Sequence, residues 1–135
     1  MHKENLSAES REKANELSRL VIGAAIEGHR HLGPGLLESA YQACLKRELE
    51  LRQIPFRSQV DLPVEYKGIE VASAYRMDLV VGDLVVVELK SVEGLDPIHE
   101  AQLLTYLRLS NRWLGLLINF NVAVLKNGVR RLVLG

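Results

Sequence analysis

In the stretch between Tyr75 and Tyr106, the charged residues Asp78, Glu88 and Lys90 are set in runs of Leu and Val. Asp78 precedes the run Leu-Val-Val, while Glu88 and Lys90 follow the run Val-Val-Val. Short runs rich in valine predict strands that are buried on at least one face. Because a buried charge is costly unless it is paired or binds a metal, these three residues constrain what the stretch can form.

The turn at Gly82-Asp83 is expected to fold the two apolar runs into a hairpin. A two-residue loop would pair Asp78 with Val87 and place the two carboxylates on opposite faces of the sheet. A three-residue loop or a bulge would pair Asp78 with Glu88 and place them side by side. We predict this second arrangement.

Two neighbouring carboxylates repel each other unless a cation lies between them. Oxygen ligands suit a hard divalent ion, so Asp78 and Glu88 predict a site for Mg²⁺ or Mn²⁺. Lys90 lies on the same face of its strand as Glu88, where it could orient a water or stabilise charge on a phosphate. The alternative is a structural network in which the carboxylates pair with Arg76 and Lys90.

Apolar spacing predicts two helices in the first third of the chain. The first runs from about Ser7 to His31 and the second from about Leu36 to Arg52, and Gly33-Pro34-Gly35 separates them. The second helix is expected to bury Leu37, Ala40, Tyr41, Cys44, Leu45 and Leu49; the first, Leu17, Leu20, Val21, Ala24 and Ala25. Because Cys44 is the one cysteine, no internal disulfide can form, which fits a reducing cytosol.

Alternating or continuous apolar runs predict the strands. They are Arg57–Val64, Ile69–Val81, a strand ending at Lys90, Arg112–Phe120 and Val129–Leu134. A tight hairpin at Asn127-Gly128 is expected to lead into the last strand. The expected fold class is α/β: a mixed, mostly antiparallel central sheet flanked by helices, with the Arg112–Phe120 strand parallel to the strand that ends at Lys90.

A third helix is expected to begin at Asp96-Pro97, since Asp is a good N-cap and Pro fits the first helical position. On this helix His99, Gln102 and Tyr106 share one face. We expect that face to be turned toward Asp78 and the other charged residues of the hairpin.

The upstream segment Gly35-Leu-Leu-Glu38-Ser-Ala-Tyr41 carries a second motif, G-x-x-E-x-x-Y. With Asp78 on one strand and Glu88-Leu89-Lys90 on the next, the chain resembles the bacterial GxxExxY family, a branch of the PD-(D/E)xK nuclease superfamily. The resemblance runs from about Leu17 to Leu134. It implies a restriction-endonuclease-like core in a single nuclease-like domain, residues 1–135; residues 1–6 are expected to be a disordered N-terminus.

The resemblance implies a metal-dependent phosphodiester hydrolase, a nuclease that acts on nucleic acid. It implies that Asp78, Glu88 and the Leu89 carbonyl hold Mg²⁺ (or Mn²⁺). Glu38 would join this metal site directly or through water, or position the nucleophile; the alternative for Glu38 is a first-turn residue that satisfies the helix end. Lys90 and Gln102 would act in catalysis, and the alternative for Gln102 is a plain surface amide.

Three further side chains are candidates for contacting a substrate: Tyr41, His99 and Tyr106. We expect Tyr41 to be a core residue with its hydroxyl tied to the site. His99 could contact a phosphate or a base, and its alternative role is helix capping. Zinc is not predicted, since His29 and His31 are two apart on a helix and point in different directions.

The charge balance limits how the chain could hold a polyanion. Its 17 Lys and Arg match its 17 Asp and Glu, so there is no overall basic field to attract nucleic acid. This leaves open a non-catalytic binding or regulatory module that keeps the nuclease fold, or an enzyme on a small phosphorylated or nucleotide substrate. It also leaves open a homodimer or a partner that supplies targeting.

The apolar runs are all shorter than the ~20 residues that cross a membrane. No apolar signal region follows the N-terminal residues. We therefore expect a cytoplasmic protein with no membrane contact.

Overall fold

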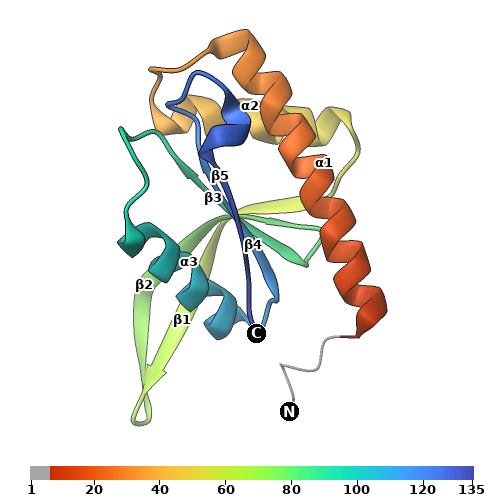
Figure 1. Cartoon of the computed structure of the whole chain (residues 1–135). Helices are drawn as coiled ribbons and strands as arrows, with labels where there is room; N and C mark the ends of the chain where they lie inside the picture. Colours follow the sequence, from red (N-terminus) through yellow and green to blue (C-terminus); the bar gives the residue numbers. More distant parts are fainter. Residues whose placement is uncertain (1–6) are drawn as a thin grey trace.

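The computed structural model describes residues 7–135, except for the side chains of residues 72–74. The expectation for residues 1–6 lies outside this range. A five-stranded sheet runs through the molecule, with α1 and α2 packed on one face and α3 on the other (Figure 1). No helix of the described residues is long and apolar enough to span a membrane.

The elements follow one another in the order α1, α2, β1, β2, β3, α3, β4, η1 and β5. The helices are α1 (Ala8–Leu32), α2 (Glu38–Leu51), α3 (Pro97–Ser110) and the short 3₁₀ turn η1 (Leu125–Gly128). The strands are β1 (Phe56–Tyr66), β2 (Ile69–Val81), β3 (Val85–Lys90), β4 (Leu114–Asn119) and β5 (Val129–Val133).

The strands lie in the sheet in the order of the sequence, β1-β2-β3-β4-β5. Only β3 and β4 are parallel, because α3 crosses over between them; the other neighbours are antiparallel. The predicted mixed, mostly antiparallel sheet and the parallel position of β4 beside β3 are confirmed.

Helix α1 begins where the side chain of Ser7 accepts the N–H of Ser10 and ends at Gly33, whose φ of 70° is unfavourable for other residues. Its buried face includes Val21, Ala24 and Ala25, as predicted. Leu20 is 41% exposed, so its expected burial is wrong. It lies beside the buried stripe rather than on it.

Helix α2 begins at Glu38 rather than Leu36. The residue before it, Leu37, has extended backbone and is 77% exposed, so its predicted place in the core is wrong. A residue outside the helix does not follow the helical spacing from which its burial was inferred. Tyr41, Leu45 and Leu49 are buried as expected, and Cys44 is half-buried.

The connection between β2 and β3 has three residues, since Val81 pairs with Val85. Gly82 and Asp83 both have positive φ, at 57° and 60°, which allows the chain to reverse direction in this short loop. The same register continues through Leu79 and Val87. It therefore brings Asp78 opposite Glu88, and the predicted three-residue loop is confirmed.

Strand β2 changes its packing partners at Asp78. Leu79 packs in the core with α1 and α2, whereas Met77 packs in the core with α3. The β1 register places Gln59, which has a φ of 52°, opposite Asp78. Beyond this point β2 pairs with β1 alone, and the two form an arm that projects from the sheet (Figure 1).

The predicted tight hairpin at Asn127-Gly128 is wrong. Both residues belong to η1, which ends a longer connection from β4 to β5. An added Cβ on Gly128 would lie 2.1 Å from the carbonyl oxygen of Asn119. The glycine therefore reflects a close backbone approach, and not a two-residue turn.

Candidate active site

The carboxylates of Asp78 and Glu88 form hydrogen bonds at the point where β2 and β3 separate. Oε2 of Glu88 accepts the backbone N–H of Asp78 at 2.8 Å, and Oδ2 of Asp78 accepts the N–H of Leu89 at 2.9 Å. The regular ladder pairs end one step earlier, at Leu79 and Val87. Side-chain oxygens thus satisfy backbone donors that face each other across the opening strands.

Burial raises the pKa of both acids. Burial, followed by the negative charge of Asp78, raises the pKa of Glu88 to about 8. Burial also raises the pKa of Asp78, against the opposing effects of the Leu89 N–H, the Lys90 charge and a side-chain hydrogen bond with Glu88. At neutral pH the Glu88 carboxyl group therefore holds a proton.

Asp78 and Glu88 do not form the alternative structural network of ion pairs with Arg76 and Lys90. Arg76 pairs with Asp61 at 3.1 Å, on the exposed side of the arm. Within residues 7–135, neither Asp78 nor Glu88 has a salt bridge to a Lys, Arg or His. The Lys90 charge lowers the pKa of both carboxylates, but it does so without direct contact.

Glu38 is the first residue of α2 and therefore belongs to the helical layer, whereas Asp78 and Glu88 belong to the sheet. Burial and the charge of Asp78 raise its pKa, and the charge of Lys90 opposes them. These effects place Glu38 within electrostatic reach of both residues. Glu38 also lies in the first turn of α2, where the alternative role of a residue that satisfies the helix end would place it.

A set of hydrogen bonds fixes the turn that precedes Glu38. The hydroxyl of Tyr41 donates to the carbonyl of Gly33 at 2.5 Å and accepts the N–H of Leu36 at 3.2 Å. The Ser91 hydroxyl, one residue after Lys90, donates to the carbonyl of Leu36 at 2.6 Å. The turn is thereby tied both to α2 and to the end of β3.

Tyr41 is a core residue, as expected, with 1% of its surface exposed and its ring stacked on Phe120 at 4.5 Å. Its hydroxyl, however, has both a donor and an acceptor partner in the turn. The Tyr41 hydroxyl therefore has a structural role: it fixes the turn that precedes Glu38. Its predicted contact with a substrate stays a prediction.

Asn119 is a site residue that the sequence did not single out as one. It is 2% exposed, and its side chain accepts the N–H of Val92 and donates to the carbonyl of the same residue, at 3.1 and 3.0 Å. The backbone N–H of Phe120 also donates to the carbonyl of Lys90. Asn119 therefore fixes the loop after β3. The only sequence signal for this role was a polar residue at the end of an apolar strand.

Helix α3 carries Tyr106 toward the carboxylates. Tyr106 is 4% exposed, and burial followed by the charges of Glu88 and Asp78 raises its pKa to about 12. Its ring meets that of Tyr75 edge to face, with centroids 5.9 Å apart. The predicted orientation of this face of α3 is therefore right at Tyr106.

His99 caps α3, which was the alternative role considered for it. Its Nδ1 accepts the backbone N–H of Asp96 at 3.0 Å. In the neutral ring the proton must then be on Nε2, which leaves one donor for a ligand. Gln102 lies one turn along the same helix and is half-buried, so its side chain reaches solvent.

His29 and His31 lie in separate settings. His29 is buried and contacts the carbonyl of Val122 through Nε2, at 2.8 Å. His31 is exposed and lies against Glu27 of its own helix. The His29 contact joins α1 to the β4–β5 connection, and the His31 contacts lie within α1.

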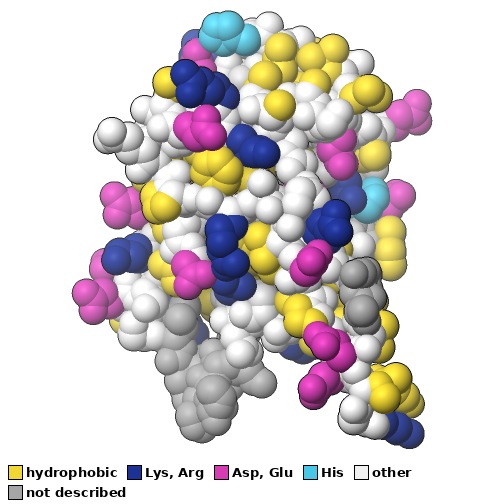
Figure 2. Space-filling view, turned by 180° about the vertical axis from the view of Figure 1, so that it is seen from behind, with side chains coloured by type: hydrophobic (Ala, Val, Ile, Leu, Met, Phe, Trp, Pro, Cys, Tyr) yellow, Lys and Arg dark blue, Asp and Glu magenta, His cyan; other side chains and the backbone are white. Residues whose placement is uncertain are grey.

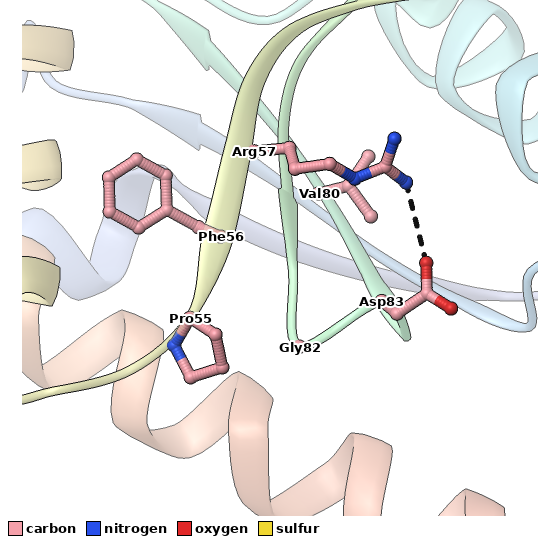
Figure 3. Close-up of a pocket in the computed structure, with 6 residues that line it drawn as sticks. All are labelled: Pro55, Phe56, Arg57, Val80, Gly82 and Asp83. Atoms are coloured by element: carbon pink, nitrogen blue, oxygen red, sulfur yellow. Dashed lines mark hydrogen bonds and ion pairs between the residues drawn. The ribbon is translucent and has the colours of Figure 1, made fainter.

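Three surface hollows lie away from the carboxylates, with volumes of about 420, 570 and 270 Å³. The first is at the turn end of the β2–β3 hairpin, where Arg57 pairs with Asp83 at 3.4 Å (Figure 3). Phe56 points to the opposite side of β1 in this view. None of the three hollows is lined by Asp78 or Glu88.

Comparison with known proteins gives one assignment. A family model described as the PD-(D/E)XK nuclease superfamily matches residues 15–132, from α1 to β5. The chain belongs to this superfamily. The match includes Glu38, Asp78 and the Glu88-Leu89-Lys90 run, and the mixed sheet flanked by helices fits the restriction-endonuclease-like core of PD-(D/E)XK proteins. No curated protein and no solved structure matched the chain.

Nucleases of the PD-(D/E)XK superfamily generally use divalent metals. The donor set of this chain fits such an ion, because Asp78 and Glu88 offer hard oxygens beside each other. A divalent cation would displace the proton that Glu88 holds, since a carboxyl group binds a metal in its deprotonated form. Among the described residues, no three side chains of His, Cys, Asp or Glu gather as a metal-binding group.

Proposed function

We propose that this protein is a metal-dependent phosphodiester hydrolase that acts on nucleic acid. The observation that carries the proposal is the pairing of Asp78 with Glu88 across the opening end of the β2–β3 hairpin. Lys90 lies on the same strand as Glu88, two residues further on. Superfamily membership supports the general class of activity, and the residue roles are our inference.

Asp78, Glu88 and the Leu89 carbonyl would hold Mg²⁺ or Mn²⁺, with Glu38 joining through water. When bound, the ion supplies positive charge that stabilises the phosphate as its negative charge develops. The chain prepares for this by keeping two carboxylates fixed through backbone N–H groups. Because the carboxylates are already ordered, metal binding would cost little of their conformational entropy.

Lys90 is the residue that would act on the phosphate from the protein side. Its ammonium lies near enough to Asp78, Glu88 and Glu38 to lower the pKa of all three. From there it could donate hydrogen bonds to a phosphate oxygen or to the attacking water. Gln102 and the Nε2–H of His99 would add neutral donors along α3.

We further propose that the chain is a member of the GxxExxY type within the superfamily. The hydrogen bonds of Tyr41 support this, because they explain why a tyrosine follows the acid by three residues. Tyr41 fixes the turn, the turn fixes the start of α2, and Glu38 is the first residue of that helix. The motif thus works as one positioning device.

A non-catalytic module that keeps the nuclease fold is the second candidate. It is favoured by the neutral net charge and by the mixing of basic and acidic side chains on the surface, as on the face in Figure 2. Such a protein would bind a metal or a partner without turnover. The two candidates make opposite predictions for cleavage.

The test is a cleavage assay with pooled single- and double-stranded DNA and RNA, in Mg²⁺, in Mn²⁺ and in a chelator. Cleavage that requires the metal and is lost in Glu88→Gln would support the hydrolase. Glu50→Gln, a substitution at an exposed residue of α2, is the matched control and should cleave normally. Cleavage that persists in Glu88→Gln would refute the assignment of the site.

A further inference from the structure

The exposed ring of Tyr75 lies next to the proposed active site. Tyr75 is on β2, three residues before Asp78, and it is 38% exposed. Its ring packs edge to face against Tyr106, with an interplanar angle of 63°. Tyr106 is in turn within the electric field of Glu88 and Asp78. A solvent-accessible aromatic ring is therefore one side chain away from the two carboxylates.

The arginine that adjoins Tyr75 in sequence is already paired with an acid, which limits what it can offer to a phosphate backbone. Arg76, next to Tyr75 in sequence, is paired with Asp61, and Arg130 is paired with Glu100 of α3. The net charge of the chain is also zero. Duplex binding depends mainly on charge contacts with phosphates, which this surface is poorly equipped to make.

Stacking offers a different source of affinity. A nucleic-acid base on an aromatic side chain gains about 1–3 kcal/mol, with little dependence on sequence. Bases within a duplex are already stacked on their neighbours, so only an unpaired base could use the ring. The edge contact with Tyr106 also supports the orientation of Tyr75, which reduces the entropy lost when a base stacks on it.

We propose that Tyr75 stacks on an unpaired base next to the phosphate that would lie at the site of Asp78, Glu88 and Lys90, so that the substrate is single-stranded nucleic acid. This inference rests on the proposed function and specifies its substrate class. It makes Tyr75 a substrate-binding residue. It also gives the part of the arm nearest the sheet a direct role in recognition.

The test measures binding of a short, fluorescently labelled, mixed-sequence single-stranded DNA by anisotropy. All variants carry Glu88→Gln, so that turnover does not disturb the measurement. Tyr75→Ala should weaken binding about tenfold, and Tyr75→Phe should keep it, because phenylalanine retains the aromatic face. The same strand in duplex form should bind more weakly than the single strand.

The matched control is Tyr66→Ala, because Tyr66 is an exposed tyrosine of the same arm, 59% exposed and at its tip. That substitution should leave binding unchanged. Tyr75→Leu keeps an apolar contact for Tyr106 without an aromatic face, and it should weaken binding as Tyr75→Ala does. Thermal denaturation of each variant checks that the fold is intact.

Equal binding of duplex and single strand, or equal binding by the Tyr75→Ala and Tyr66→Ala variants, would overturn the inference. Its failure is separable from that of the proposed function. Tyr75-dependent binding by a protein that cleaves nothing in Mg²⁺ or Mn²⁺ would support stacking and refute the hydrolase. Metal-dependent cleavage that is unchanged in Tyr75→Ala would support the hydrolase and refute stacking.

Discussion

The backbone N–H of Asp78 donates to the carboxylate of Glu88 at 2.8 Å, across the end of the β2–β3 hairpin. The reciprocal bond runs from the N–H of Leu89, the next residue along β3, to the carboxylate of Asp78. Each acid therefore has two separate tasks. It satisfies a backbone donor by its oxygen, and it contributes negative charge to the site.

These tasks can be separated by substitution at Asp78. Asp78→Asn keeps an oxygen acceptor for the N–H of Leu89 but removes the charge, whereas Asp78→Ala removes both. Because Leu89 is fully buried, the alanine variant should lose about 1–3 kcal/mol of unfolding free energy, and the asparagine variant should lose clearly less. Urea denaturation measures both.

Asp61→Ala is the control for this pair, since Asp61 is an exposed partner of Arg76 and should cost under ~1 kcal/mol. Equal stability of Asp78→Ala and Asp78→Asn would show that the hydrogen bond to Leu89 contributes nothing.

The raised pKa of Glu88 predicts how stability depends on pH without metal. The folded protein holds a proton on Glu88 up to a pKa of about 8, while the unfolded chain releases it near the ordinary value of 4.5. The folded state therefore binds more protons between these values, and stability should fall as pH rises from about 4.5 to about 8. Melting temperatures in a chelator, at pH 5, 6.5 and 8, measure the slope.

Glu88→Gln should flatten that slope, since glutamine does not titrate, and it should be the more stable protein at the alkaline end. Added Mg²⁺ should stabilise the wild type most at high pH, where the carboxylates carry charge. A wild type that gains stability from pH 5 to pH 8 in the chelator would contradict the assignment of a raised pKa.

The turn before Glu38 should depend on the Tyr41 hydroxyl. Tyr41→Phe removes two hydrogen bonds and should cost about 1–2 kcal/mol of unfolding free energy, while leaving the ring stacked on Phe120. Tyr66→Phe, at an exposed tyrosine, should cost almost nothing. Denaturation in urea gives both values.

Ser91→Ala removes the other tie to the same turn, so its effect should be coupled to that of Tyr41→Phe. In a double-mutant cycle, the two changes together should differ from their sum by at least ~0.5 kcal/mol. Additive effects would mean that the two hydroxyls do not hold one common structure.

Gly128 should tolerate no side chain, because an added Cβ would lie 2.1 Å from the Asn119 carbonyl oxygen. Gly128→Ala should cost about 3 kcal/mol or more, and it should loosen the Asn119 contacts with the loop after β3. Gly94→Ala is the control, since its added Cβ meets nothing within 4 Å. Equal melting temperatures for the two variants would refute this reading of Gly128.

Much of the fold was predictable from local patterns. The valine runs and Gly82 define the β2–β3 hairpin, Gly33-Pro34-Gly35 ends α1, and Asp96-Pro97 starts α3. These are features whose cause lies within a few residues. The pairing of Asp78 with Glu88 follows from the loop length, and so it too was within reach of the sequence.

The contacts that complete the site were not predictable, because their partners are distant in sequence. Ser91 binds the carbonyl of Leu36, 55 residues away, and Asn119 binds Val92, 27 residues away. The left-handed conformation of Gln59 has no local signal, since glutamine does not favour it. At Gly128 a familiar Asn-Gly turn signal was misleading, because tertiary packing determines that glycine.

The most direct test of the account is calorimetric titration of Mg²⁺ and Mn²⁺ into the wild type and Asp78→Asn, with the cleavage assay run on the same samples. The wild type should bind the metal and cleave nucleic acid. Asp78→Asn should stay folded and lose both metal binding and cleavage. A folded Asp78→Asn variant that binds the metal and cleaves like the wild type would contradict it.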